Sequence, residues 1–315
     1  MTFGSASTTD EVLEGVDLSG SWVLITGVSA GIGVETARAA AAHGANVILG
    51  VRDIEKGEAA TAVVRDAARA RGGVVELRRV DLASLESVRA FTDAVGADHD
   101  RLDTIIANAG VMAVPESRTT DGFELQFGTN HLGHFVLVNR LRPLFGSGPA
   151  RIVNLSSRGH RFSDVVLDDV NFEATPYEPW QAYGRSKTAN VLFAVELDRR
   201  GRDRGQRACA VHPGTVTTEL GRYLTHETLE SLPTARANVQ TVWKEPPAGA
   251  ATSVWAAFVG GDDEVGGRYC EDCHVSEIVD DPTSPTGVFG YALDPGRARE
   301  LWTRSEELVD ESFPD

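Results

Sequence analysis

Residues Trp22 to Gly33 have the sequence Trp-Val-Leu-Ile-Thr-Gly-Val-Ser-Ala-Gly-Ile-Gly, an apolar run that leads into a glycine-rich turn. The apolar run is typical of a buried strand, and the alanine-rich residues 34–43 that follow predict a helix. A turn without bulky side chains between a strand and a helix lets the backbone approach a pyrophosphate at the helix N-terminus. The stretch therefore favours a dinucleotide-binding turn. Because the glycines stand at 27, 31 and 33 rather than in the common G-x-G-x-x-G spacing, an ordinary glycine-rich connection is the alternative.

The rest of the chain repeats this alternation of short apolar strands and helices. We expect strands at residues 22–26, 46–51, 74–80, 104–107, 151–155 and 208–212, with a last one near residue 270. We expect helices at residues 31–43, 54–71, 84–95, 121–144, 181–200 and 297–309. Strands rich in Val, Ile and Leu are typical of a parallel sheet that is buried on both faces. The order therefore predicts an α/β fold, a doubly wound parallel sheet with helices on both faces.

A tyrosine and a lysine stand four residues apart near the start of the helix expected at 181–200. This spacing places Tyr183 and Lys187 on one helical face. A phenol has an ordinary pKa of about 10, and a neighbouring ammonium is expected to lower it toward the range useful for acid–base chemistry. The chain has only three lysines, at 56, 187 and 244, so a lysine here indicates a need for a compact, flexible ammonium. Chance placement on a surface helix is the alternative.

Four further motifs follow the glycine-rich turn in order along the chain. They are Asn108-Ala109-Gly110, Asn130 within Thr129-Asn130-His131-Leu132-Gly133-His134-Phe135, Ser156-Ser157, and Pro213-Gly214-Thr215-Val216-Thr217. Together with Tyr183 and Lys187 they resemble the short-chain dehydrogenase/reductase family, and most of all its retinol-dehydrogenase-like branch. The resemblance implies a single-domain, Rossmann-like NAD(P)-binding fold over residues 18–275, followed by a C-terminal extension at 276–315.

The resemblance also implies a role for each residue of the reactive centre. It implies reversible hydride transfer between a nicotinamide cofactor and a carbonyl or alcohol, with Tyr183 as the proton donor in reduction and the acceptor in oxidation. Lys187 would lower the pKa of Tyr183 and hold the nicotinamide ribose, and Ser157 would hydrogen-bond the reacting oxygen. Asn130 would hold a water that links Lys187 to solvent. Ser156 is the rival of Ser157, but the family has its catalytic serine at the second position of such a pair.

The family pattern places the cofactor against several segments of the chain, with Asp81 and Leu82 at the adenine and Asn108 near the adenine ribose. The expected cofactor-binding residues are Gly27, Ser29, Ala30, Gly31, Ile32, Gly33, Arg52, Asp81, Leu82, Asn108, Ala109, Gly110, Tyr183, Lys187, Pro213, Gly214, Val216 and Thr217.

The end of the second expected strand indicates which nicotinamide cofactor is used. An acidic residue there binds the ribose of NAD(H), whereas an arginine accommodates the 2′-phosphate of NADP(H). The chain has Val51 at the acidic position and Arg52 after it, which favours NADP(H). A shift of one residue would make Asp53 a ribose ligand and favour NAD(H). We instead expect Asp53 to cap the helix that begins at Ile54.

The substrate class is indicated by side chains around the expected cleft. Residues 216–247 lie where the family has its mobile lid, and the expected substrate contacts are Met112, Trp180, Leu220 and Tyr223, with Val114 and Phe162 facing the same cleft. Such a lining suits an apolar or aromatic alcohol or ketone. A pair of surface helices is the alternative for residues 216–247.

Two other functions share parts of this pattern. An isomerase or dehydratase of the family's extended branch also has the Tyr-x-x-x-Lys pair, but its glycine spacing differs and it has a larger C-terminal domain. A non-catalytic NADP-binding sensor is expected to have lost one of Asn130, Ser157, Tyr183 and Lys187, and all four are present.

Composition limits the partners and the location. The chain has 315 residues, 42% of them hydrophobic, which is enough for a sizeable core. A formal net charge of −16 argues against nucleic acid and against an anionic membrane surface. No apolar run of about 18 residues is present, and the N-terminus has no secretory pattern. We therefore expect a soluble cytoplasmic protein without the membrane anchor of many retinol dehydrogenases. A homodimer or a homotetramer is left open.

Two groups of metal-binding residue types are predicted to be structural. Cys270 and Cys273, followed by His274, match a haem-attachment pattern, but haem attachment needs export and a zinc site needs two further ligands. His131 and His134 stand three residues apart without a third ligand. We therefore expect no metal site, buried structural thiols, and histidines used in helix packing.

Overall fold

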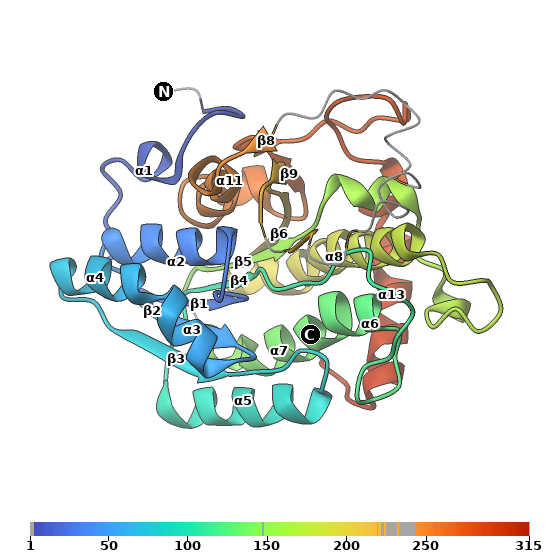
Figure 1. Cartoon of the computed structure of the whole chain (residues 1–315), viewed down its shortest axis with the longest axis horizontal. Helices are drawn as coiled ribbons and strands as arrows, with labels where there is room; N and C mark the ends of the chain where they lie inside the picture. Colours follow the sequence, from blue (N-terminus) through green and yellow to red (C-terminus); the bar gives the residue numbers. More distant parts are fainter. Residues whose placement is uncertain are drawn as a thin grey trace.

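The computed structural model describes residues 3–146, 148–218, 220–221, 224, 232 and 243–314. Within these residues an eight-stranded sheet runs through the middle of the molecule in the order β10-β9-β6-β5-β4-β1-β2-β3 (Figure 1). Its strands are β1 Trp22–Thr26, β2 Asn46–Val51, β3 Val75–Arg79, β4 Thr104–Ala107, β5 Ala150–Leu155, β6 Gln206–His212, β9 Tyr269–Glu271 and β10 His274–Val275. Neighbouring strands are parallel except β9 and β10, which are antiparallel. A separate short pair joins β7 Thr215–Val216 to β8 Trp243–Lys244.

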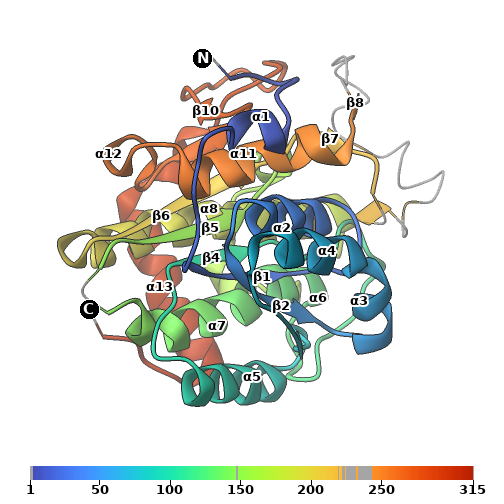
Figure 2. The same ribbon diagram turned by 90° about the vertical axis from the view of Figure 1, so that its left-hand side faces the viewer.

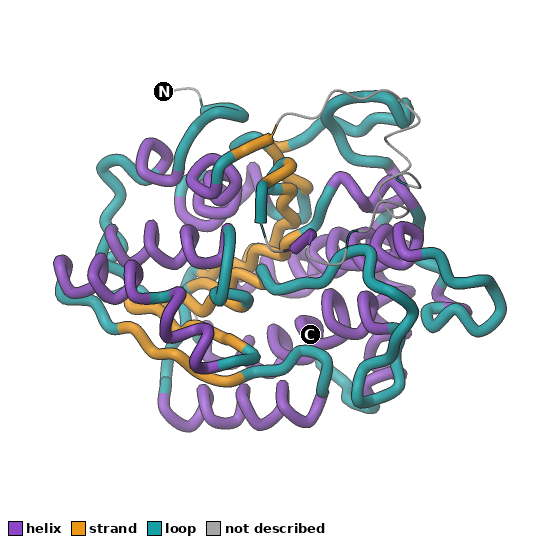
Figure 3. The backbone as a smooth tube through the Cα atoms, in the orientation of Figure 1, coloured by secondary structure: helices purple, strands orange, loops and turns teal. Residues whose placement is uncertain are grey.

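Helices cover both faces of the sheet, so the predicted doubly wound α/β architecture is confirmed (Figures 2 and 3). One face carries α1 Thr9–Val12, α2 Ile32–Ala42, α3 Ile54–Ala60, α4 Ala62–Arg71 and α11 Pro246–Phe258. The other carries α5 Leu85–Asp98, α6 Leu125–Phe127, α7 Gly133–Leu141, α8 Pro179–Gly201 and α13 Pro295–Val309. The short helix α12 Asp262–Val265 lies beside β6. None of the described helices is both long enough and apolar enough to cross a bilayer.

Side chains of the central strands alternate between the two helical layers. Leu24 and Ile105 belong to the core beneath α5, α7, α8 and α13, whereas Val23 and Ile25 belong to the core beneath α2 and α11. All four are fully buried. Each buried side chain of this size contributes about 1.5–3 kcal/mol relative to an exposed one. The continuous apolar run at residues 22–26 thus serves two cores at once, because successive side chains of a strand point to opposite faces.

Two expected helices differ from the structure. The helix expected at 54–71 is divided at Thr61, which ends α3 and precedes α4, and whose Oγ1 donates to Gly57 O at 2.8 Å. The helix expected at 121–144 starts only at Leu125, because the Glu124 side chain accepts hydrogen bonds from the backbone N–H groups of Gln126 and Phe127. It continues through a π-helical turn at Gly128–Leu132 and ends in a 3-10 turn at Arg142–Phe145.

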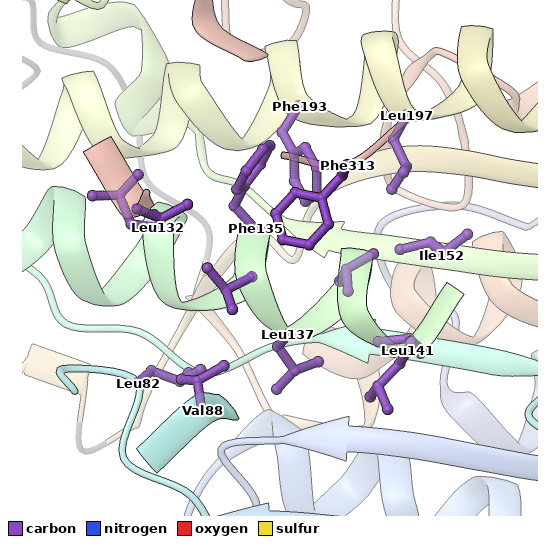
Figure 4. Packing of buried hydrophobic residues seen from close by; sticks show 14 of the residues in the cluster. Leu82, Val88, Leu132, Phe135, Leu137, Leu141, Ile152, Phe193, Leu197 and Phe313 are labelled. Atoms are coloured by element: carbon purple, nitrogen blue, oxygen red, sulfur yellow. The ribbon is translucent and has the colours of Figure 1, made fainter. Parts of the chain in front are cut away.

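The C-terminal segment covers the face formed by α7 and α8. Trp302 of α13 is 1% exposed and packs edge-on against Phe135, with the ring centroids 5.1 Å apart, while its ring lies 5.8 Å from Phe193. Phe313 lies against Phe135 as well (Figure 4). The residues after 275, which sequence analysis placed outside the family pattern, therefore complete the larger of the two cores.

Replacing Trp302 with alanine should lower the free energy of unfolding by about 3–5 kcal/mol, because a large buried side chain leaves a cavity that its neighbours fill only in part. Urea unfolding followed by circular dichroism measures the change. Trp243→Ala, at a side chain that is 65% exposed, is the matched control and should change stability by less than about 0.5 kcal/mol. Equal losses in the two variants would contradict the packing role of α13.

Candidate active site

The glycine-rich turn joins β1 to α2 and leaves no room for side chains at its closest points. Gly27 has a φ of +75°, a left-handed conformation that favours glycine. A Cβ on Gly33 would lie 2.5 Å from Asn108 Nδ2 and closer still to the carbonyl oxygen of Gly27. Helix α2 begins at Ile32 without a capping side chain, so the N–H groups of its first turn remain available to an anion. The turn fits a dinucleotide pyrophosphate.

A cavity of about 330 Å³ opens at the carboxyl ends of β1, β2 and β4, in front of this turn. Fifteen of the predicted cofactor residues line it: Gly27, Ser29, Ala30, Gly31, Ile32, Gly33, Arg52, Asp81, Leu82, Asn108, Ala109, Gly110, Pro213, Gly214 and Val216. Thr217, Tyr183 and Lys187 do not line it, and Leu220, expected at the substrate, does. Asp53, the alternative ribose ligand, lines it too, and the lining residues that were not predicted are Thr26, Gly50, Val51, Lys56, Val80, Val111, Thr129 and Thr218. Most of these flank a predicted residue, so neighbourhood in the sequence was the available signal.

The end of β2 presents basic side chains to the cavity. Asp53 caps α3 by accepting the backbone N–H of Lys56 at 3.0 Å, as predicted. The bond uses only Oδ1, and Asp53 also lines the cavity, so it stays the alternative ribose ligand. Arg52 is exposed and lines the cavity together with Lys56. Lys56 stands four residues after Arg52 in the first turn of α3, a spacing that could have identified it from the sequence.

The two serines after β5 point in different directions. Ser156 Oγ donates to the backbone oxygen of Lys187 at 2.8 Å, so it is engaged with the body of α8. Ser157 begins the 3-10 turn Arg158–Phe162, and its Oγ accepts the backbone N–H of Gly159 at 3.0 Å. Its Oγ also lies near Tyr183, since a Cβ on Gly159 would be 3.4 Å from this oxygen and 2.6 Å from Tyr183 Cε1. The structure thus brings Ser157, rather than Ser156, to Tyr183.

Burial dominates the acid–base properties of Tyr183 and Lys187. It raises the pKa of Tyr183 to about 12, with a smaller opposing effect from the Ser157 side chain. It lowers the pKa of Lys187 to about 7. The Lys187 Nζ lies 5.7 Å from the centre of the Tyr183 ring and donates to Leu155 O at 2.9 Å. The predicted lowering of the Tyr183 pKa by Lys187 is therefore wrong for this arrangement, because burial disfavours both charged forms.

Asn130 lies in the π-helical turn and joins two parts of the site. Its side chain exchanges hydrogen bonds with the backbone of Val111, at 2.8 Å to the N–H and 2.9 Å to the oxygen. It also donates to Ser186 Oγ on α8 at 2.9 Å. A Cβ on Gly110 would lie 3.1 Å from Asn130 Oδ1 and 3.6 Å from Lys187 Nζ, so Asn130 and Lys187 approach the same backbone position.

His134 connects this turn to the glycine-rich turn. Its Nδ1 must donate to the backbone oxygen of Asn130 at 3.0 Å, because a carbonyl only accepts. Its Nε2 therefore accepts the hydroxyl of Thr26 at 2.9 Å. Burial lowers the pKa of His134 to about 4, which keeps the ring neutral. Sequence analysis assigned His134 to helix packing only and missed this connection.

A sequence model of the family described as short chain dehydrogenase matches residues 21–228, about two thirds of the chain. The chain belongs to the short-chain dehydrogenase/reductase family. It is 40% identical over 293 residues to Short-chain dehydrogenase/reductase prx1 of Penicillium roqueforti, covering 91% of this chain and 84% of the relative. It is also 40% identical over 304 residues to human retinol dehydrogenase 14, with coverage of 93% and 87%. These relatives confirm the predicted likeness to the retinol-dehydrogenase-like branch.

A solved structure is similar over nearly the whole length of this short-chain dehydrogenase. It is the crystal structure of an uncharacterized protein from Mycobacterium paratuberculosis, with a TM-score of 0.72 and 38% sequence identity. The match covers 95% of this chain and 97% of the other. The similarity therefore includes the C-terminal segment as well as the sheet.

Next to Tyr183 this short-chain dehydrogenase has an apolar cluster. Ala113, Trp180 and Tyr183 form its buried part, and the side chains packed against them are Met112, Phe162, Leu224 and Leu232. Met112, Trp180 and Phe162 were predicted to face one cleft, and the structure brings them together. Val114, also predicted there, is buried outside the cluster. Tyr223 and most of residues 216–247 lie outside the described residues.

The three cysteines are buried thiols, as predicted for Cys270 and Cys273. Cys270 lies in β9, and the backbone N–H of Cys273 donates to Thr252 Oγ1 at 3.2 Å. His131 is fully buried, with Nε2 2.8 Å from Ser305 Oγ of α13. The cysteines and His131 thus make contacts inside the protein core, which is the structural role predicted for them.

Gly33→Ala should weaken the binding of the dinucleotide cofactor by about tenfold or more, equivalent to about 1.4 kcal/mol. The added Cβ cannot fit beside Asn108 Nδ2 without displacing the turn. Isothermal titration calorimetry with NADPH measures the affinity. Gly96→Ala on α5, where a Cβ would meet open space, is the control and should bind as the wild type does. Unchanged affinity in Gly33→Ala would contradict this placement of the cofactor.

Proposed function

We propose that this protein transfers a hydride reversibly between NADP(H) and the carbonyl or alcohol group of an apolar or aromatic small molecule. Family membership makes it an oxidoreductase that uses a nicotinamide dinucleotide. The observation that carries the proposal is the meeting of Ser157, Tyr183 and Lys187 beside both the nucleotide cavity and the apolar cluster. Nucleotide, proton donor and apolar substrate can then occupy adjoining spaces.

Each polar side chain has a distinct task in this proposal. The bound nicotinamide supplies the hydride in reduction and accepts it in oxidation. Tyr183 gives its phenolic proton to the carbonyl oxygen, and a pKa of about 12 keeps that proton in place at neutral pH. Ser157 hydrogen-bonds the same oxygen and stabilises the charge that develops there. Lys187, by the family pattern, would hold the nicotinamide ribose, and a pKa of about 7 lets it gain or lose a proton near neutrality.

The choice of NADP(H) rests on charge at the end of β2. Arg52 and Lys56 are the two cationic side chains in the cavity lining, and a guanidinium binds a phosphate through paired, charge-assisted hydrogen bonds. Asp53, the residue that would favour NAD(H), lines the cavity as well but caps α3 through Oδ1.

The substrate class rests on the apolar cluster around Tyr183, whose members are aliphatic or aromatic. Retinol, the alcohol in the name of the human relative, is of this class. The location in the cytoplasm, a homodimer or homotetramer, and the boundary at residue 275 stay predictions of the sequence.

Tyr183→Phe should lower kcat by about 100-fold or more, the range usual for a positioned acid–base group. The ring volume is kept, so NADPH affinity should not change. Steady-state assays with NADPH and a panel of apolar ketones and aldehydes measure kcat. Tyr177→Phe is the control, because its hydroxyl contacts Val114 O and Gln126 rather than the reactive centre. A Tyr183→Phe rate above about a tenth of the wild-type rate would reject this role of Tyr183. Wild-type protein that binds NADPH without turning over any carbonyl would favour the sensor.

Arg52→Ala should raise KM for NADPH by about tenfold and leave KM for NADH nearly unchanged, because only NADPH carries the 2′-phosphate that Arg52 would bind. The difference should shrink at high salt, which screens an exposed ionic contact. Comparing kcat/KM for both cofactors on both proteins tests this. Arg69→Ala, which removes an exposed arginine paired with Asp66, is the control. A wild-type preference for NADH would contradict the assignment of NADP(H).

A further inference from the structure

His160 lies between the turn that begins at Ser157 and the C-terminal segment. The ring is fully buried, with Nδ1 2.7 Å from Ser157 O and Nε2 3.2 Å from the backbone nitrogen of Phe289. His160 and Phe289 are 129 residues apart in the sequence. The imidazole is thus a direct connection between the Ser157 backbone and residues beyond the family pattern.

The direction of both hydrogen bonds follows from their partners. A backbone N–H can only donate, so His160 Nε2 must accept from Phe289. A neutral imidazole then carries its proton on Nδ1, which donates to Ser157 O. Burial lowers the pKa of His160 to about 4 and keeps this single neutral form at neutral pH. The Phe289 N–H therefore favours the tautomer whose Nδ1–H donates to Ser157 O.

The same segment holds the turn at two more points. Tyr291 donates its hydroxyl to His160 O at 2.7 Å, beside a second bond to that oxygen from Thr188 Oγ1 of α8 at 2.9 Å. Arg161 donates to the carbonyl oxygens of Ser284 and Gly287, and its guanidinium lies 5.4 Å from the centre of the Phe289 ring. The turn Arg158–Phe162 is thus held from one side by α8 and from the other by residues 284–291.

The turn has little freedom to shift without moving Ser157 against Tyr183. A Cβ on Gly159 would lie 2.6 Å from Tyr183 Cε1, and a Cβ on Gly184 would lie 2.7 Å from Ser163 N. Backbone and phenol ring are therefore in direct contact. Since misplacement by about 1 Å can lower a rate by about 100-fold, whatever fixes the Ser157 backbone also fixes the reacting geometry.

We propose that His160 is a positioning residue that transmits the packing of residues 284–291 to Ser157. Its Nδ1–H holds the Ser157 carbonyl, and Phe289 and Tyr291 hold the imidazole and its backbone in place. The C-terminal segment is then part of the machinery of the reactive centre, although none of these residues touches the reacting atoms. This inference rests on the proposed function, because it takes Ser157 as the residue that binds the reacting oxygen.

Two substitutions each keep one hydrogen bond of His160 and remove the other. In His160→Asn the amide nitrogen can take the place of Nδ1 and donate to Ser157 O, but it cannot reach Phe289. In His160→Gln the amide reaches the position of Nε2 and can accept from Phe289, while the donor to Ser157 is lost. Each variant loses one hydrogen bond, so a purely structural role predicts similar losses of Tm and of kcat in the two.

The proposal predicts that kcat follows the Ser157 bond. His160→Asn should keep kcat within about threefold of wild type, whereas His160→Gln should lose about 10- to 100-fold in kcat. The affinity for NADPH should be unchanged in both. His43→Gln is the matched control, since His43 Nδ1 hydrogen-bonds a backbone oxygen, that of Val16, at 2.9 Å away from the site. Equal kcat in the Asn and Gln variants, or kcat that tracks Tm, would overturn the proposal.

A double-mutant cycle separates this inference from the proposed function. If Ser157→Ala alone is as active as wild type, the proposed role of Ser157 fails. If Ser157→Ala is impaired, adding His160→Gln should lower kcat by no more than about twofold further, because coupled residues are not additive. A full additional loss would show that His160 does not act through Ser157.

Tyr291→Phe tests the C-terminal end of the connection even if neither His160 variant folds. It removes only the hydroxyl that donates to His160 O. We expect kcat to fall by about three- to tenfold, less than for a lost acid–base group, and the loss to vanish in the Ser157→Ala background. Wild-type kcat in Tyr291→Phe would overturn the role of the C-terminal segment.

Discussion

The nucleotide-binding half of the structure depends on the hydrogen bonds that the Asn108 side-chain amide makes. Its Nδ2 donates to the backbone oxygens of Thr26 at 2.8 Å and Gly27 at 3.2 Å, and its backbone N–H donates to Thr26 Oγ1 at 3.0 Å. It therefore ties the end of β4 to the end of β1. In the sheet, β5 lies next to β4 and β2 lies next to β1, on opposite sides of this pair. The connections that follow β4 and β1 therefore run in opposite directions, and a crevice opens between them. Gly33 completes the arrangement, because a side chain there would collide with the same amide.

From Thr26 the polar connection continues toward the reactive centre. The Thr26 hydroxyl donates to His134, and His134 donates to the backbone oxygen of Asn130. The Asn130 side chain then joins the Val111 backbone to Ser186 on α8. The side chains of this connection, those of Thr26, His134, Asn130 and Ser186, are buried and hydrogen-bonded. Satisfied buried polar networks specify one arrangement, because any alternative leaves a polar group without a partner. The network thus fixes α8, which carries Tyr183 and Lys187, relative to the nucleotide cavity.

Low solvent exposure has opposite effects on the two titratable groups of the reactive centre. It raises the pKa of Tyr183 and lowers that of Lys187, so both groups favour their neutral forms. Proximity of an ammonium would act in the other direction, but Lys187 Nζ is engaged with Leu155 O. Burial therefore leaves a tyrosine that keeps its proton beside a lysine that titrates near neutrality. These are the protonation states from which the proposed reaction would start.

The sequence by itself determined the local elements and the doubly wound α/β architecture, whereas the order of the strands came from the structure. Strands β1, β2 and β4 have the predicted bounds. Short apolar runs bounded by turn residues are a local signal for a buried strand, and they can be read from the sequence. The cap at Asp53 and most of the nucleotide-cavity lining were also predictable, because they depend on residues close together in the chain. Tertiary structure alone decided the start of the helix at Leu125, where the Glu124 side chain caps it. It also decided the raised pKa of Tyr183 and the lowered pKa of Lys187, which follow from burial. It also decided the connections through His134 and His160. These join residues up to 129 positions apart, and hydrogen bonds between such distant residues leave no periodicity or spacing in the sequence.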